Sequence, residues 1–384
     1  MRRHARLPIE ELQPYLLATP PAARLVWADV FGNAHPVEIE VGFGKGLHLM
    51  TAGAAQILLK QSGVVCQGAV LVGSGPLLYL VAHQMVKAGA PPLALVETRT
   101  WRDEVAALRH LGGAVRGWRV LAKGLQMLWQ LRRSRIRRYT GATELAVEGP
   151  DGVRALCFRA KGKDVRLPCE TVLLHHGVVP DTQAARSVGI PHKWNIAQNC
   201  FAPEKDGWGR TPVKTLFVAG DGAGIGGAKA AALSGEIAAL AIAADLGRLT
   251  PQQRDSAVRA LRAGLDREQA VRPFIDRAFP PYGGALLAPD DTIICRCEEV
   301  TAGEIRGAAR LGCLGPNQAK AFCRAGMGPC QGRFCGLTVT QILSDLHNTP
   351  PDKTGYLTIR PPLKPVTLGE IAALSEPDTN EASP

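Results

Sequence analysis

The sequence predicts an α/β protein with a doubly wound parallel sheet, added antiparallel strands and a small helical, cysteine-rich domain near its C-terminal end. Short apolar segments such as GAVLVGSG and PLALVE alternate with helical segments, which is typical of parallel sheets. At about 139–180 the segments alternate in polarity instead, which indicates antiparallel strands. The third observation is that six of the ten cysteines lie between Cys295 and Cys335.

Helices and strands are expected in an order that fits this sheet. Segment 1–46 predicts a helix, a Pro-rich connection and the strand VEIEVGF, for which we expect an edge position in the sheet. A helix is expected at about 50–61, and charged helices are expected over 251–278. The first of these helices has one apolar face, formed by Met50, Ala54, Ile57 and Leu58.

Composition divides the chain into five parts. Pro and Gly in FPPYGGALLAPDD mark a linker between the sheet core and the cysteine-rich domain. The expected parts are an N-terminal segment (1–49), the nucleotide-binding core (50–250), helices with the linker (251–289), the cysteine-rich domain (290–348) and an extended tail (349–384).

The formal net charge is +11, and part of it is the cluster RRSRIRR, which holds five arginines between Arg132 and Arg138. This cluster ends the helical pattern VLAKGLQMLWQL, and positive charge suits the C-terminal end of a helix dipole. Since no recognised nucleic-acid motif or aromatic platform accompanies it, we interpret it as a solvated helix end and expect no nucleic-acid partner.

The sequence also favours a reducing compartment. MRRHARLPIEEL lacks the apolar segment of a secretory signal, and no stretch of 18 uncharged apolar residues predicts a membrane span. We therefore expect a cytoplasmic protein whose cysteines are ligands or free thiols rather than disulfides.

The segment VLVGSGPL predicts a nucleotide-binding turn between a strand and a helix. Gly73 would permit the tight turn, and Gly75 would permit close approach of a pyrophosphate. Glu97 ends the next strand, where a carboxylate would bind ribose hydroxyls. Arg99 and Arg102 leave the choice between NAD and NADP open, and a glycine-lined turn without a ligand is the alternative.

The segment KTLFVAGD predicts a second buried strand, which carries Gly220 and Asp221 at its carboxyl end. Glycines then open an Ala-rich helix, so that Asp221 would accept from sugar hydroxyls while the helix N-terminus faces a phosphate. We interpret His175 and His176, at another strand end, as buried structural histidines, and we assign no catalytic acid or base.

Four cysteines stand out by their spacing, as the pairs Cys295-x-Cys297 and Cys330-x4-Cys335. DTIICRC predicts a strand, on which residues two apart face the same side, and TAGE predicts a capped helix directly after it. Four thiolates without a nearby histidine suit zinc or a [2Fe–2S] cluster, and C-x-C is unusual for zinc. A redox-active Cys330–Cys335 disulfide is a further alternative. We interpret the remaining thiols as structural or unligated: Cys66, Cys157, Cys169, Cys200, Cys313 and Cys323.

The C-x-C element, the helix after it and the turn GMGPCQGRFC resemble the ferredoxin-like [2Fe–2S] domain of the bacterioferritin-associated ferredoxin type. The resemblance covers about 290–340. It implies a [2Fe–2S] cluster held by Cys295, Cys297, Cys330 and Cys335.

TLFVAGDGAG resembles the second FAD motif of two-dinucleotide-binding flavoproteins, and LLHHGVVPDTQ resembles the segment before that motif. Together these stretches resemble the FAD-dependent, pyridine-nucleotide-disulfide-reductase-like α subunits of opine oxidases, hydrogen cyanide synthase and hydroxyproline dehydrogenase. The resemblance implies FAD, an iron–sulfur cluster and a partner flavoprotein subunit of the amino-acid-oxidase type. It implies an electron-transfer subunit of an enzyme that oxidises a small amino acid or opine.

The N-terminal part departs from that family, which begins with a strand–GxGxxG–helix unit for FAD that the sequence does not show, so we expect an N-terminally truncated member. HARLPIEELQPYLL and HPVEIEVGFGKGLHL instead resemble the start of a tRNA (guanine-N7)-methyltransferase. Its S-adenosylmethionine loop would match Glu40, Gly42, Gly44 and Gly46. A methyltransferase-derived fusion and a non-catalytic Fe–S-binding remnant are therefore the alternative functions.

Overall fold

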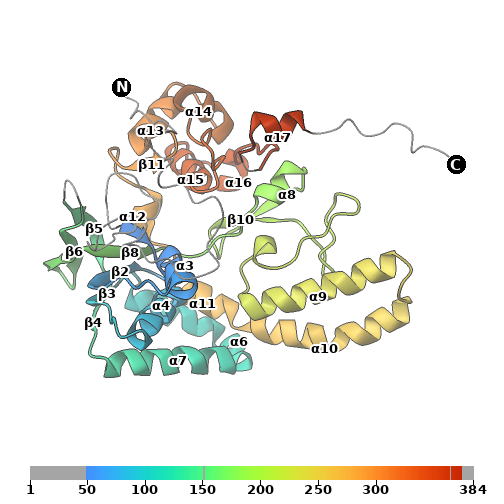
Figure 1. The fold of residues 1–384 in the computed structure, drawn as a ribbon, viewed down its shortest axis with the longest axis horizontal. Coiled ribbons are helices and arrows are strands. Elements are labelled where there is room, and N and C mark those ends of the chain that lie inside the picture. Colours follow the sequence, from blue (N-terminus) through green and yellow to red (C-terminus); the bar gives the residue numbers. More distant parts are fainter. Residues whose placement is uncertain (1–48, 150–151, 364, 374–384) are drawn as a thin grey trace. The chain divides into compact units, whose positions relative to one another are not determined.

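The computed structural model describes residues 49–149, 152–363 and 365–373, which belong to one compact unit (Figure 1). Its central sheet has five strands in the order β1-β8-β2-β3-β4, and every pairing is parallel. This sheet confirms the predicted parallel α/β core. Its strands are β1 (Leu49–Thr51), β2 (Ala69–Gly73), β3 (Ala94–Glu97), β4 (Arg137–Thr140) and β8 (Thr171–His175).

Both faces of this sheet are covered, which explains why its central strands are apolar throughout. Leu71, Leu95 and Leu173 point to the face that carries three helices. Val72 and Val96 point to the other face, against a three-stranded antiparallel sheet that confirms part of the predicted antiparallel stretch. The prediction is wrong for the end of that stretch, because β8 joins the central sheet in parallel. These covering elements are α3 (Ala52–Ser62), α4 (Pro76–Lys87), α7 (Trp118–Arg133), β5 (Thr143–Glu148), β6 (Ala155–Ala160) and β7 (Lys163–Pro168).

The predicted apolar face of the first helix is wrong in part. Met50 lies in β1 rather than in the helix, and the side chain of Ile57 is 56% exposed. Ala52 and Ala55 are the buried positions of α3, because small side chains let the helix lie close to the sheet. β1 lies at the edge of the described sheet, and the strand VEIEVGF, predicted for that place, lies outside the described residues.

The arginine cluster RRSRIRR is divided between a helix and a strand. Arg132 and Arg133 lie in the last turn of α7, as predicted for a helix end, whereas Arg138 lies in β4 and pairs with Glu97. Between β3 and α7 the chain forms α5 (Trp101–Ala107), the short 3₁₀ helix η2 (Leu108–His110) and α6 (Leu111–Arg116).

The strand predicted for KTLFVAGD is wrong. No strand of the described sheets pairs along this segment. It forms one isolated bridge, between Arg210 and Phe217. Around it lie α8 (Gln183–Ser187), the hairpin of β9 (His192–Asn195) and β10 (Cys200–Pro203), and the 3₁₀ helix η3 (Asp221–Ala223).

The Ala-rich segment forms a helix, as predicted, that packs against the next helix. Lys229 and Glu268 connect the two by an ion pair of 2.7 Å. Within the described ranges no helix is both long enough and apolar enough to cross a bilayer. The helices are α9 (Ala228–Asp245), α10 (Pro251–Ala270), α11 (Arg272–Ala278) and, in the linker, α12 (Gly283–Leu286).

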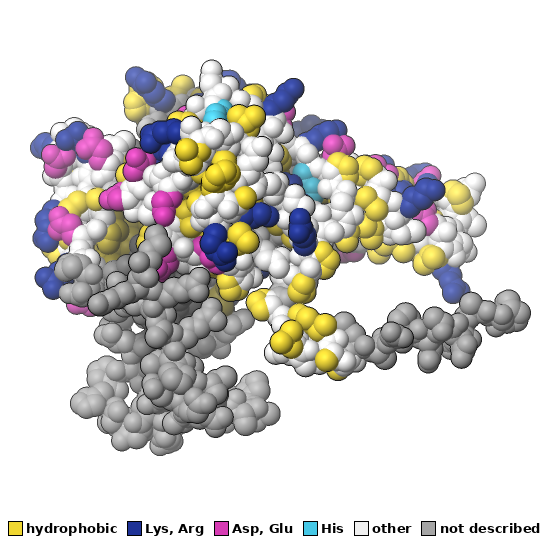
Figure 2. Space-filling model, turned by 90° about the horizontal axis from the view of Figure 1, so that it is seen from above, with side chains coloured by type: hydrophobic (Ala, Val, Ile, Leu, Met, Phe, Trp, Pro, Cys, Tyr) yellow, Lys and Arg dark blue, Asp and Glu magenta, His cyan; other side chains and the backbone are white. Residues whose placement is uncertain are grey.

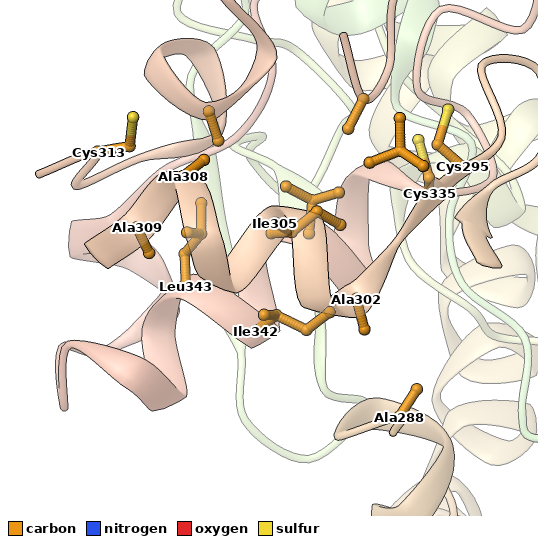
Figure 3. Packing of buried hydrophobic residues seen from close by; sticks show 14 residues of the cluster. Ala288, Cys295, Ala302, Ile305, Ala308, Ala309, Cys313, Cys335, Ile342 and Leu343 are labelled. Carbon is orange, nitrogen blue, oxygen red and sulfur yellow. The ribbon is translucent and has the colours of Figure 1, made fainter. Parts of the chain in front are cut away.

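The cysteine-rich domain has its own core, in which Ile305, Ile342 and Leu343 are fully buried (Figure 3). Thr301 and Glu304 form the predicted capping box. Leu357, from the predicted tail, packs against Gly326 and Gly332 of this domain and is 2% exposed. Its elements are β11 (Ile293–Cys295), β12 (Val300–Thr301), α13 (Ala302–Arg310), α14 (Pro316–Cys323), α15 (Gly336–Leu346), α16 (Pro351–Thr354) and α17 (Leu368–Ala372).

The cysteine-rich domain is fastened to α8 of the core. The side-chain amide of Gln183 donates to the carbonyl of Gln331 at 3.1 Å. The guanidinium of Arg186 stacks on the ring of Tyr356, 4.1 Å from its centroid, and on the ring of Phe201, at 4.9 Å. The contacts of Gln183 with Gln331 and of Arg186 with Tyr356 join residues more than 140 positions apart in the chain.

Candidate cysteine and nucleotide sites

The structure brings the four predicted ligand cysteines together as two pairs. Cys335 lies beside Cys295 at one end of the domain's core, and both residues are 2% exposed (Figure 3). Cys330 lies close enough to Cys297 to raise the pKa of its thiol, and this pair is the more exposed one. Among the described residues no three Cys, His, Asp or Glu side chains surround a single metal position.

Backbone amides turn toward the sulfur of Cys295. The Cys335 thiol and then the amides of Gly326, Glu298 and Cys297 lower the pKa of Cys295 to about 6, although burial opposes this shift. The N–H of Gly326 donates to this sulfur at 3.4 Å. Donors that converge on a sulfur favour its anionic form, which is the form that binds metal.

The glycines of the segment GMGPCQG are favoured at their positions for different structural reasons. A Cβ at Gly328 would overlap the Cβ of Cys297, so the turn can lie this close to Cys297 only with glycine at position 328. Gly326 and Gly332 have φ of +88° and +77°, a region that favours glycine, and both lie against Leu357. These constraints shape the loop that carries Cys330.

One part of the cysteine prediction is wrong. The strand β11 ends at Cys295, and Cys297 lies in the turn before β12, where Glu299 has a φ of +55°. The two thiols therefore reach their partners from a turn rather than from one face of a strand. Cys313 lies at the opposite end of the domain's core from Cys295 and Cys335 (Figure 3).

The glycine turn after β2 lies where the strand order of the parallel sheet reverses, which is where ligands bind in open α/β sheets. Gly73 and Gly75 have φ of +130° and +134°. The space beside them is taken by β8, since a Cβ at Gly75 would lie 2.7 Å from Nε2 of His175. The N–H of Ser74 donates to the carbonyl of His175 at 2.8 Å.

Three buried polar atoms at this edge have no hydrogen-bond partner among the described residues. They are Oγ of Ser74, Oγ1 of Thr98 and Nδ1 of His176, which follow the ends of β2, β3 and β8. Buried polar groups are normally paired, so these atoms indicate room for a polar ligand or for water at the carboxyl ends of three adjacent strands.

Burial lowers the pKa of His175 and of His176 from the ordinary 6.5 to about 4, and His176 adds to the shift at His175. As the pH falls, these histidines bind protons in the unfolded chain before they do so in the folded protein. Their contribution to the free energy of unfolding is therefore fully present above about pH 6.5 and is lost as the pH falls toward 4. We expect the free energy of unfolding to fall by about 2–3 kcal/mol per histidine over this window.

Urea unfolding at pH 7 and pH 4.5 measures this loss. The variant His176→Gln should lose less stability on acidification than the wild type. An equal loss in both proteins would contradict the prediction.

Glu97 lies in a buried ionic network and is 2% exposed. Its carboxylate accepts from the hydroxyl of Tyr79, from Nε of Arg99 at 3.1 Å and from Nη2 of Arg138 at 2.6 Å. Both oxygens are therefore engaged within the protein, in the place where the sequence predicts ribose binding. Tyr79 and Arg138 carry no sequence signal for this network, because they come from α4 and β4 and meet Glu97 only in the folded sheet.

The arginines considered for a 2′-phosphate are also engaged. Arg99 pairs with Glu97 and, at 2.6 Å, with Glu104, whereas Arg102 stacks on the ring of Trp101 at 5.8 Å from its centroid. Neither arrangement selects between NAD and NADP.

Asp221 is the first residue of η3, which precedes α9. Its Oδ1 accepts from the N–H groups of Gly226 and Gly227, both at 3.2 Å, and the side chain is exposed. Gly220 has a φ of +76°, and its N–H donates to Oγ of Ser234 at 3.0 Å. Asp221 thus organises the N-terminal end of α9, the position where the sequence predicts an FAD contact.

The linker packs over the same edge of the central sheet as the glycine turn. The ring of Phe279 lies edge-on to the ring of Tyr79, with 5.9 Å between the ring centroids. The guanidinium of Arg99 stacks on the ring of Phe279, 4.9 Å from its centroid. The ring of Tyr282 lies 5.9 Å from that of His176, and its hydroxyl accepts from the N–H of Glu144 at 3.1 Å. A ligand at the carboxyl ends of β2 and β8 would therefore meet this linker.

Comparisons with known proteins agree with this organisation. A family model described as Sarcosine oxidase A3 domain matches residues 290–375, which include the four paired cysteines and Leu357. The solved L-proline dehydrogenase from P. horikoshii is similar in fold, with a TM-score of 0.57 and 15% identity, over 84% of this chain and 53% of that one. A tRNA (guanine-N(7)-)-methyltransferase of Streptococcus equi subsp. equi is 47% identical over 45 residues, 12% of this chain and 21% of that protein.

Several relatives cover most of the chain, among them two enzyme subunits. The hydrogen cyanide synthase subunit HcnB of Pseudomonas aeruginosa is 30% identical over 75% of this chain and 63% of its own length. The opine oxidase A subunit of Rhizobium meliloti (strain 1021) is 43% identical over 330 residues, 85% of this chain and 71% of that protein. Since this last similarity covers more than two thirds of both proteins, the chain belongs to the family of opine oxidase A subunits, which are oxidoreductases.

Proposed function

We propose that the chain is the electron-transfer subunit of an FAD-dependent amine or amino-acid dehydrogenase or oxidase of the opine type, and that it passes electrons between the flavin and a [2Fe–2S] cluster. The pairing of Cys295 with Cys335 and of Cys297 with Cys330 carries this proposal. A [2Fe–2S] cluster has two thiolate ligands on each of its two irons. Two adjacent pairs match that requirement better than a single tetrahedral ion does.

The chain's own residues would prepare the site for such a cluster. The amides around Cys295 favour its thiolate, and the buried position of Cys295 and Cys335 keeps water from that pair. When bound, the flavin would accept two electrons as hydride, and the cluster would carry them one at a time. The more exposed pair, Cys297 and Cys330, would face the electron acceptor or donor.

For the nucleotides we propose that FAD contacts Gly220 and Asp221, and that NAD or NADP binds at the turn of Gly73 and Gly75. The unpartnered atoms at the ends of β2, β3 and β8 support the second of these sites. Glu97 would act on that nucleotide indirectly, by fastening Tyr79 and Arg138 at the same edge.

Nucleotide affinity tests the second site. If Ser74 and Thr98 donate to the nucleotide, the double variant Ser74→Ala/Thr98→Val should bind NADH or NADPH at least about tenfold more weakly by titration calorimetry. Ser187→Ala is a matched control, because its exposed hydroxyl donates to the carbonyl of Ala184 away from this edge. Unchanged affinity in the double variant would contradict the assignment.

The same proposal includes a partner. We propose a hetero-oligomer with a second, amino-acid-oxidase-like flavoprotein subunit that binds a small amino acid or opine, in the cytoplasm. The description of both relatives as subunits supports a multi-subunit enzyme.

A non-catalytic Fe–S-binding remnant is the second candidate, and the geometry of Asp221 favours it. That carboxylate is bound to its own loop, and the preceding segment is not a strand. A visible spectrum of anaerobically purified protein separates the candidates: flavin bands near 450 nm, roughly, with cluster bands support electron transfer, whereas cluster bands alone support the remnant. A methyltransferase-derived function would require S-adenosylmethionine binding, which calorimetry measures directly.

A further inference from the structure

The helix α7 has an apolar stripe that the fold does not use. Leu128 and Leu131 pack toward α4 and the central sheet, which accounts for the inner face of the helix. Trp118, Leu125 and Trp129 lie roughly a third of a turn away and are 60%, 67% and 55% exposed. A helix that covers a sheet needs one apolar face, so this second stripe calls for another explanation.

The exposed tryptophans are paired with arginines. Arg119 stacks on Trp118 at 5.8 Å from the ring centroid, and Arg133 stacks on Trp129 at 4.6 Å. Trp101 of α5, 68% exposed, carries Arg102 in the same way. Each ring thus lies beside a cation that can reach an anionic group while the indole enters an apolar layer.

The charge of residues 101–135 is predominantly positive. Residues 101–135 contain eight Arg and Lys side chains and two acidic ones. Both acidic residues are already paired, Asp103 with Arg277 at 3.2 Å and Glu104 with Arg99 at 2.6 Å. By contrast, basic and acidic side chains are interspersed on the face shown in Figure 2.

We propose that the outer stripe of α7, defined by Trp118, Leu125 and Trp129 with the flanking basic residues, docks on an anionic lipid bilayer. Tryptophan beside arginine, along an apolar stripe of a helix that does not span the membrane, is the pattern of an interfacial helix. Headgroups supply the negative charge, and the boundary of the acyl chains takes the indoles and Leu125.

The charge argues against two other occupants. A second copy of the chain would bring an equally basic stripe against this one, and like charges would repel. A protein partner of ordinary mixed surface charge would leave these basic side chains without matched anions, whereas an anionic leaflet presents negative charge along the whole helix. α7 lies along one margin of the described unit, below α4 in Figure 1, so a flat surface can approach it.

Vesicle flotation tests the proposal with the full chain. We expect it to float with vesicles of POPC and POPG in a 7:3 ratio and not with POPC alone. Trp118→Ser/Leu125→Ser/Trp129→Ser should lower the partition coefficient about tenfold or more, and Arg119→Gln/Arg132→Gln/Arg133→Gln should do so by a similar factor. Quenching of tryptophan fluorescence by brominated lipid should be strong in the wild type and weak in the first variant.

Matched controls remove exposed apolar and basic side chains elsewhere, as Leu246→Ser/Leu311→Ser and Arg248→Gln/Arg310→Gln, and should leave flotation unchanged. Circular dichroism of every variant confirms folding, and the surface variant Arg119→Gln/Arg132→Gln/Arg133→Gln leaves the inner face of α7 intact. Absence of flotation at millimolar lipid overturns the proposal. So does equal binding to neutral vesicles, or wild-type binding by both stripe variants. A partner protein that displaces the chain from vesicles, with loss of that complex in the stripe variants, would assign the stripe to a protein instead.

Discussion

Replacing Cys330 by serine is expected to remove iron and sulfide from the purified chain almost completely. In the proposed site Cys330 and Cys297 hold one of two irons, and a hydroxyl is a poor substitute for a thiolate ligand there. The wild type should contain about two irons and two sulfides per chain after anaerobic purification or reconstitution. The measurement is elemental analysis together with the visible spectrum.

Cys323→Ser provides the matched control, since Cys323 is half-buried in the same domain and its thiol donates to the carbonyl of Ala319. It should keep the full iron content. Equal iron loss in both variants would mean that the substitution disturbs folding rather than ligation. Iron-free wild type after reconstitution would contradict the cluster itself, and zinc in its place would favour the alternative metal.

Glu97→Gln is expected to produce the largest loss of stability outside the cysteine site. The substitution leaves two guanidinium groups, of Arg99 and Arg138, beside a neutral amide in a buried position. Removing one partner of a buried ionic network costs about 3–5 kcal/mol, because the remaining charges stay buried without compensation. Urea unfolding of both proteins at pH 7 measures the difference.

Glu148→Gln is the control for this prediction, because Glu148 pairs with Arg166 on the protein surface. It should unfold at the same urea concentration as the wild type. If Glu97→Gln behaved in the same way, Glu97 would be free of a structural role, and the assignment of its carboxylate to a ribose would regain support.

Local signals in the sequence were sufficient for much of the fold. Apolar runs and glycine turns located β2 and β3, because both strands are buried on two faces. The same reasoning failed for KTLFVAGD, which is apolar but pairs with no strand of the described sheets. Apolar composition shows that a segment prefers burial, and a strand also needs a neighbour, which is a property of the assembled sheet.

The candidate sites, too, could be predicted from the sequence only in part. The spacing of Cys295, Cys297, Cys330 and Cys335 predicts which thiols act as ligands, and this stays a prediction, although the structure brings Cys335 beside Cys295 (Figure 3) and Cys330 near Cys297. The partners of Glu97 could not be predicted, because the network joins residues up to 41 positions apart that lack a shared motif. A carboxylate at the end of a strand looks the same in sequence whether it faces a ligand or an arginine.

The stacking of Arg186 on both Phe201 and Tyr356 has a consequence for the cooperativity of unfolding. A cysteine-rich domain joined to the core only by its linker would melt on its own. Here the aromatic rings, the amide of Gln183 and the ion pair of Arg333 with Asp181 make partial opening of either part costly to the other. Heat or denaturant would then expose the buried cysteines and unfold the central sheet in a single transition rather than in two steps.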